Sequence, residues 1–152
     1  QSGEIAAIAR CLREIVEAGG ELRDCCVMLR TVALRDRYLE AIRAEGLDVV
    51  LLQRRADNRA VSGVRVCNMH RVKGLEFRHV VIASVRDGVV PNRLAVEGSE
   101  DGTELRDRDL AERALVHVCA SRAIESLMVT WHGEPSEYLA SWHEVPDTFS
   151  TG

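Results

Sequence analysis

The chain has 152 residues, of which 46% are hydrophobic and 29% charged, and its formal net charge is −4. This length suits a single domain with a real apolar core. The acidic balance excludes a protein that holds nucleic acid by a broad basic surface alone, because phosphate neutralisation supplies most non-specific affinity. Aromatic residues make up only 4%, so the core must rest on Val, Leu, Ile and Ala. That composition favours a parallel sheet covered by helices.

The five cysteines are odd in number and form no C-x-x-C pair, and four of them lie in apolar runs or on an apolar helix face. This pattern predicts reduced, buried thiols rather than disulfides or a metal site. No apolar run approaches the length of a membrane span, and the N-terminus has no signal-peptide pattern. We therefore expect a cytoplasmic protein without membrane contacts.

The first part of the chain alternates helical and strand patterns. Residues 4–18 place apolar side chains on one helical face and end at a Gly-Gly pair. The apolar runs 25–29 and 49–52 predict buried strands, and residues 34–45 between them return to helical spacing. Residues 53–63 are polar and predict a loop.

The second part continues the alternation. Three more strands are predicted, at 64–69, 79–84 and 126–131. An acidic stretch at 97–104 predicts an exposed loop, and a helix is predicted from about 105 to 123, with a short helix at 136–142. Strands joined through helical segments imply right-handed crossovers and a mostly parallel sheet. The fold class is therefore α/β, in a single domain.

Motifs of self-sufficient enzymes are missing from the sequence. It has no Walker A loop G-x-x-x-x-G-K-[ST], no H-E-x-x-H metal pattern and no G-x-S-x-G elbow. Lys73 is the only lysine beside a glycine, and it precedes that glycine. Without a loop to cradle the β- and γ-phosphates, the chain alone is predicted not to hydrolyse ATP.

Residues 64–91 carry the most specific pattern, VRVCNMHRVKGLEFRHVVIASVRDGVVP. It resembles motif V of the UvrD/Rep-type superfamily 1 DNA helicases, which is T-x-H-x-x-K-G-L-E-[FWY], then an apolar strand, then a Gly-x-x-Pro turn. The matching positions are His70, Lys73, Gly74, Leu75, Glu76, Phe77, Gly88 and Pro91. Two positions depart from the family pattern, because Asn68 replaces the favoured Thr and Val72 replaces a small residue.

Two further segments resemble motifs of the same family. ERALVHVCASRA, at 112–123, is similar to motif VI, and His117 and Ser121 stand in place of Tyr and Thr. The matching positions are Glu112, Leu115, Val118, Arg122 and Ala123. Residues 27–49 resemble motif IV, with Arg30 directly after the predicted strand.

The resemblance covers nearly the whole chain in the family's order. It implies a second RecA-like helicase domain over residues 1–145 and a loose tail over 146–152. Typical members insert a large accessory domain between motifs IV and V, whereas only residues 53–63 separate the strands here. The chain therefore resembles a compact subset of the family, and it is expected to be a fragment of a larger ATP-dependent enzyme.

The resemblance also implies roles at an ATP site between two lobes. Arg122 and Arg30 match the arginines that reach across to the γ-phosphate, where a guanidinium stabilises charge on the phosphoryl oxygens. Glu76 matches the carboxylate that binds the nucleotide ribose, with Gly74 and Lys73 as neighbouring nucleotide contacts. Mg²⁺ would be bound mainly by the N-terminal RecA-like lobe, which this chain lacks.

DNA contacts are implied by the same resemblance. His70 lies where motif V links the nucleotide to single-stranded DNA, and Asn68 lies beside it; helix and loop backbone groups there can also contact phosphate. The implied partners are the N-terminal lobe of the same protein, single-stranded DNA and another DNA-bound protein.

Three functions stay open from the sequence. The favoured one is the C-terminal motor domain of an ATP-dependent DNA helicase or translocase. The second is a degenerate RecA-like interaction module without an ATPase role, for which the substitutions at Asn68, Val72, His117 and Ser121 argue. The third is an unrelated doubly wound domain such as a receiver, against which the lack of an acidic cluster at strand ends and of G-x-G-x-x-G argues.

Overall fold

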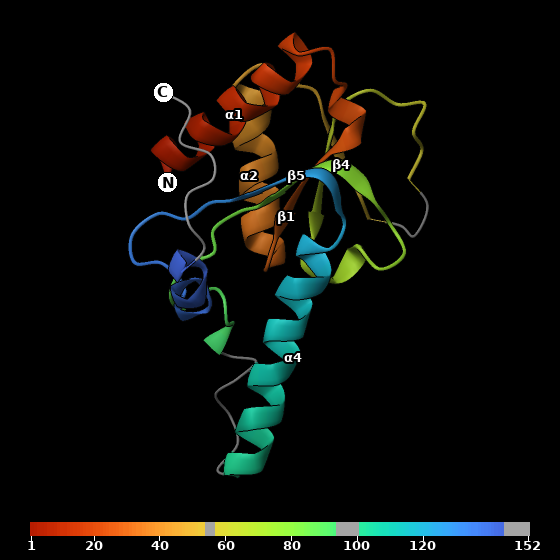
Figure 1. Cartoon of the computed structure of the whole chain (residues 1–152). Coiled ribbons are helices and arrows are strands. Elements are labelled where there is room, and N and C mark those ends of the chain that lie inside the picture. The colour runs from red at the N-terminus through yellow and green to blue at the C-terminus, as the bar shows by residue number, and fades with distance from the viewer. Residues whose placement is uncertain (54–56, 94–100, 145–152) are drawn as a thin grey trace.

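The computed structural model describes residues 1–53, 57–93 and 101–144. Within them the chain forms a five-stranded sheet in the order β2-β3-β1-β4-β5 (Figure 1). All four neighbouring pairs are parallel. The strands are β1 (Cys25–Leu29), β2 (Val49–Leu51), β3 (Val64–Asn68), β4 (Phe77–Ile82) and β5 (Ala123–Val129). The predicted α/β fold with a parallel sheet is confirmed.

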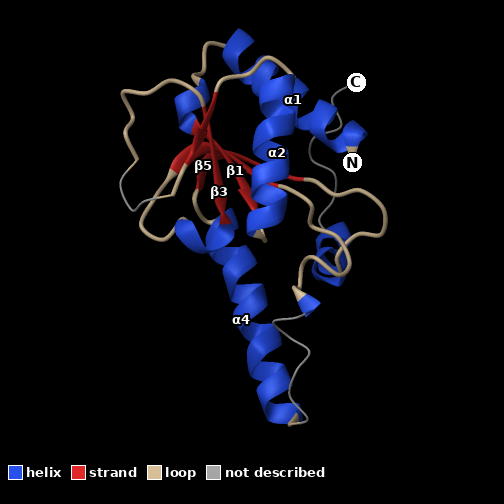
Figure 2. Cartoon of the chain, turned by 180° about the vertical axis from the view of Figure 1, so that it is seen from behind, coloured by secondary structure: helices blue, strands red, loops and turns tan. Residues whose placement is uncertain are grey.

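Helices lie on both sides of this sheet (Figure 2). They are α1 (Ser2–Glu17), η1 (Leu22–Asp24), α2 (Val32–Ala44), η2 (Met69–Arg71), α4 (Gly102–Ala120) and η3 (Glu137–Glu144). The elements η1, η2 and η3 are 3₁₀ helices, so the short helix predicted at 136–142 is of the tighter kind. None of the described helices has the length and apolar character needed to cross a membrane.

Two apolar cores follow from the alternation of side chains along β1. Cys25, Val27 and Leu29 pack with α1 and α2 on one face of the sheet. Cys26 and Met28 point the other way and pack with α4 and η3. Each face of a central parallel strand is thus covered by helices, which explains why β1 is apolar at every position.

The cysteines lie where the sequence predicted. Cys25, Cys26, Cys67 and Cys119 are buried, Cys11 is half-buried, and all five are free. Burial raises the pKa of the Cys25 and Cys119 thiols to about 12. These side chains therefore serve as small core residues and are poor nucleophiles.

Helix α4 differs from its predicted bounds at both ends. Its first turn lies inside the acidic stretch predicted to be a loop, because the Asp101 side chain accepts a hydrogen bond from the Thr103 amide at 2.9 Å and caps the helix. It ends at Ala120, so Arg122 lies in the turn before β5 rather than in the helix. The other acidic positions 97–100 and the predicted tail 146–152 lie outside the described residues.

Glu4 of α1 is a buried acid that joins the two ends of the chain. Its carboxylate accepts hydrogen bonds from the Tyr38 hydroxyl at 2.7 Å, the Ser84 amide at 2.7 Å and the Thr130 hydroxyl at 2.6 Å. The His132 Nδ1 lies 2.5 Å from the same carboxylate. Burial alone raises the pKa of Glu4, but these hydrogen bonds outweigh it and hold the pKa below the ordinary value of 4.5.

We expect Glu4→Gln to lower the free energy of unfolding by about 2 kcal/mol at neutral pH, because hydrogen bonds to a buried charge are lost. The folded-state pKa of Glu4 is lowered, so its contribution is complete above the unfolded pKa near 4.5 and is lost as the pH falls through the folded value. Urea denaturation should therefore show the unfolding free energies of the wild type and of Glu4→Gln becoming equal as the pH falls. Glu17→Gln, an exposed acid on the same helix, is the control and should unfold like the wild type. A gap that stays constant into strong acid would contradict an ionised Glu4.

Candidate functional site

Asn68, His70 and Arg30 form one cluster at the carboxyl edge of the sheet. Leu29 and Asn68 are paired in register at the ends of β1 and β3. The Asn68 side-chain nitrogen donates to the Arg30 main-chain carbonyl at 3.2 Å, and the Asn68 side-chain oxygen accepts from the His70 main-chain N–H at 3.2 Å. Asn68 thus both links the two strands and caps η2, which begins the predicted DNA-contacting segment.

Arg30 is paired inside the domain with Glu112 of α4. Its Nε lies 3.0 Å and its Nη2 2.5 Å from the two carboxylate oxygens, and both residues are buried, with 8% and 6% of their surface exposed. The Asn92 main-chain N–H donates to the same carboxylate at 3.0 Å. Burial raises the pKa of Glu112, but the Arg30 hydrogen bond and the Asn92 amide bring it below its ordinary value. The positive charge of Arg30 is therefore neutralised in this structure.

His70 is exposed beside this ion pair. Burial of part of the ring, and then the positive charge of Arg30, lower the pKa of His70 below its ordinary value of 6.5. The imidazole is thus neutral at physiological pH, so it can donate or accept a hydrogen bond but adds no charge.

Arg122 and Glu76 lie together at the opposite, amino edge of the sheet. The Phe77 amide donates to the Arg122 carbonyl at 3.0 Å, so the turn before β5 touches the start of β4. Within the described part of the chain, the Arg122 guanidinium makes two long hydrogen bonds, from Nε to the Val118 carbonyl at 3.3 Å and from Nη2 to the Ser121 hydroxyl at 3.5 Å. No carboxylate of the described residues pairs with it. Its charge is available to an anion.

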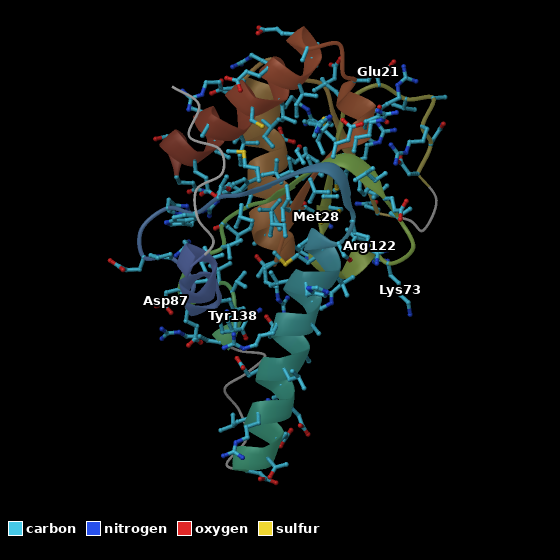
Figure 3. All side chains as sticks on the ribbon, in the orientation of Figure 1. Glu21, Met28, Lys73, Asp87, Arg122 and Tyr138 are labelled. Atoms are coloured by element: carbon cyan, nitrogen blue, oxygen red, sulfur yellow. The ribbon has the colours of Figure 1, made fainter. Side chains whose placement is uncertain are left out.

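Lys73, Gly74 and Glu76 form an exposed turn that leads into β4. The Leu75 amide closes this turn on the Val72 carbonyl at 3.1 Å. Gly74 has a φ of +79°, a left-handed conformation that glycine adopts without strain. Figure 3 shows Lys73 and Arg122 on the same side of the molecule, beside the C-terminal end of α4. The structure thus brings together the candidate nucleotide residues of motif V with Arg122.

The two candidate arginines lie at different positions along α4. Arg30 contacts α4 at Glu112, whereas Arg122 follows the end of the same helix. The eight helical steps from Glu112 to Ala120 span roughly 12 Å at the α-helical rise. Arg30 therefore belongs to the cluster with Asn68 and His70, and Arg122 to the cluster with Glu76.

Two contacts at these clusters have no counterpart in the sequence analysis. Glu112 was a matching position in a motif, but its ion pair joins residues 82 apart in the chain. Arg59, in the polar loop before β3, donates to the Glu76 carbonyl at 2.7 Å, and nothing in its sequence context marks it. No group of His, Cys, Asp or Glu in the described ranges could hold a metal ion.

The parallel five-stranded sheet, covered by helices on both faces and flanked by these loops, defines a RecA-like α/β domain. The chain belongs to the UvrD-like helicase C-terminal domain family, whose sequence profile matches residues 50–134. This range contains every candidate residue except Arg30. The resemblance seen in the sequence motifs is therefore confirmed at the level of the family.

A protein of Bacillus subtilis (strain 168) named "Putative ATP-dependent DNA helicase YjcD" is 34% identical over 68 residues. The match covers 45% of this chain and 9% of that protein. The crystal structure of the C-terminal domain of a possible DNA helicase from Lactobacillus plantarum WCFS1 superposes with a TM-score of 0.66 and 20% identity. That match covers 90% of this chain and 71% of the other, and it confirms the fold.

The buried ion pair gives a stability prediction. We expect Glu112→Ala to lower the free energy of unfolding by roughly 3–5 kcal/mol, because it leaves the Arg30 charge buried without a partner. Chemical denaturation of the purified chain measures this difference. Glu104→Ala, which removes an exposed ion pair with Arg108 on the same helix, should cost about 0.5 kcal/mol or less. Equal losses in the two variants would mean that Arg30 and Glu112 are not paired in solution.

Proposed function

We propose that this chain is the C-terminal motor domain of an ATP-dependent DNA helicase or translocase and that it completes an ATP site with the N-terminal RecA-like lobe of the same protein. The proposed lobe spans residues 1–145. The observation that carries the proposal, beside membership of the family, is the position of Arg122. Its guanidinium has no carboxylate partner among the described residues, and its main chain adjoins the exposed Glu76.

Each residue of this cluster has a distinct task in the proposal. Arg122 places a fixed positive charge at the γ-phosphate, where phosphoryl transfer spreads negative charge over the oxygens. The Glu76 carboxylate accepts hydrogen bonds from the ribose hydroxyls, while Lys73 and the Gly74 turn contact the nucleotide beside it. When ATP is bound, its Mg²⁺ is held mainly by the N-terminal lobe.

Arg30 takes part only after its charge is released. In the structure it is neutralised by Glu112, so a γ-phosphate must replace the carboxylate before Arg30 can stabilise the reaction. This exchange would couple nucleotide binding to the carboxyl edge of the sheet, where Asn68 and His70 lie. In the proposal these two residues contact single-stranded DNA, with the neutral His70 ring as a hydrogen-bonding or stacking group.

The short connection between β2 and β3 indicates what kind of motor this domain would serve. Since the strands are separated only by residues 52–63, we propose a translocase that acts on another DNA-bound protein or relies on other domains to separate strands. A net charge of −4 implies that DNA is held jointly with the N-terminal lobe.

One observation favours a second candidate function, a RecA-like interaction module without an ATPase role. Arg30, one of the two arginines predicted to contact the γ-phosphate, is paired with Glu112 inside the domain. In such a module the ion pair would only hold α4 against the sheet. Activity of the arginine variants separates the two proposals.

In the protein that joins this chain to its N-terminal lobe, we expect Arg122→Ala to cut DNA-stimulated ATP hydrolysis by on the order of 10³-fold or more while ATP binding persists. Turnover is measured by phosphate release and binding by a fluorescent nucleotide. Arg108→Ala, an arginine on α4 paired with Glu104, is the matched control and should hydrolyse ATP normally. Unchanged turnover in Arg122→Ala would remove Arg122 from the reaction and favour the interaction module.

The isolated chain of 152 residues should show no ATPase activity and only weak DNA binding. The reason is that it carries no Walker A loop and no excess of positive charge. Fluorescence anisotropy with a labelled single strand should show binding that falls steeply between about 50 and 200 mM salt. Robust hydrolysis by the chain alone would refute the shared-site proposal.

A further inference from the structure

The loop before β3 is built around a buried arginine. Arg65 of β3 has no exposed surface, and its Nε lies 3.0 and 3.2 Å from the two Asp57 carboxylate oxygens. Its Nη1 donates to the Gly63 carbonyl at 2.7 Å and its Nη2 to the Asn58 carbonyl at 2.7 Å. A guanidinium that is satisfied on all sides fixes the path of residues 57–63 against the sheet. Residues 57–63 of this loop are therefore held in a defined position.

Arg59 extends from this loop toward η1. Its Nε lies 2.8 Å from the Asp57 carboxylate, and its Nη1 donates to the Arg23 carbonyl at 2.8 Å and the Asp24 carboxylate at 3.3 Å. The Arg23 side chain donates back to the Arg59 carbonyl at 3.1 Å. The Arg59 side chain is thus held from three directions although 41% of its surface is exposed.

The free end of Arg59 reaches the peptide group between Glu76 and Phe77. Its Nη2 donates to the Glu76 carbonyl at 2.7 Å, and its guanidinium carbon lies 5.0 Å from the centre of the Phe77 ring. The N–H of the same peptide group donates to the Arg122 carbonyl at 3.0 Å. One peptide group is therefore held at its oxygen by the Arg59 side chain and at its nitrogen by the Arg122 main chain.

We propose that Arg59 is a positioning residue for the nucleotide, acting through Glu76, an inference that rests on the proposed function. The Glu76 carboxylate makes no hydrogen bond or ion pair with the described residues, so its direction depends on the main chain that carries it. That main chain follows Gly74, whose φ of +79° marks a turn without side-chain restraint. Arg59 fixes the far side of this turn, and so aims the carboxylate at the ribose.

The test compares three variants in the protein that joins this chain to its N-terminal lobe. Arg59→Gln should raise the KM for ATP by about 5- to 10-fold and change kcat by less than about 2-fold, because it weakens nucleotide binding without touching the γ-phosphate. Arg59→Lys, which keeps the charge and a donor, should recover part of this loss. The matched control is Arg13→Gln, since Arg13 also donates to a main-chain carbonyl, that of Glu45 at 2.6 Å, with 45% of its side chain exposed. It should leave KM unchanged.

A second readout separates aiming from general stability. The wild type should prefer ATP over 2′,3′-dideoxy-ATP, and both Arg59→Gln and Glu76→Gln should lose most of this preference when they are assayed well below their own melting temperatures. If Glu76→Gln raises KM and Arg59→Gln does not, the inference about Arg59 is overturned and the proposed site stands. If Glu76→Gln leaves KM and the ribose preference intact, the ribose assignment fails and the role of Arg59 fails with it.

Discussion

The buried ion pair between Arg30 and Glu112 determines where α4 lies against the sheet. Its two short hydrogen bonds join the end of β1 to the middle of the helix, and the Asn92 amide completes the set. A buried pair adds little net stability compared with apolar packing, but removing one partner is costly, so it selects one arrangement over others. In this arrangement the last turn of α4 contacts η2, and the turn that follows α4 touches the start of β4.

That placement leaves the two candidate arginines in different states. Arg122 emerges from the end of α4 with its charge uncompensated by any carboxylate in the described ranges, whereas Arg30 is committed to Glu112. A domain that meets a triphosphate only when a second lobe approaches would benefit from this asymmetry. Under the proposed function, Arg122 would be ready to meet an anion at all times, and Arg30 would become available only after a competing anion had displaced Glu112.

Much of the fold was predictable because local patterns agree with the tertiary structure. The run 25–29 is apolar at every position and forms β1 with those bounds, since both faces of a central parallel strand are covered. The bounds of α4 were wrong because an aspartate cap and a turn of polar residues decide them, and neither changes the apolar spacing. Asn68 and His70 were named from a motif and lie together because they are two residues apart, while their role stays a prediction. Arg59 was not named, because its contacts join a polar loop to β4 and exist only after the sheet has formed.

The Glu4 carboxylate has a consequence for the order in which the chain acquires structure. During synthesis residue 4 leaves the ribosome well before two of its partners, Thr130 and His132, which follow β5. Until those residues appear, α1 carries an acid that it cannot bury without loss. Contacts between such distant positions slow folding and make it cooperative. During synthesis α1 therefore stays solvated while most of the strands are made. The domain then completes its fold late, as a single cooperative unit.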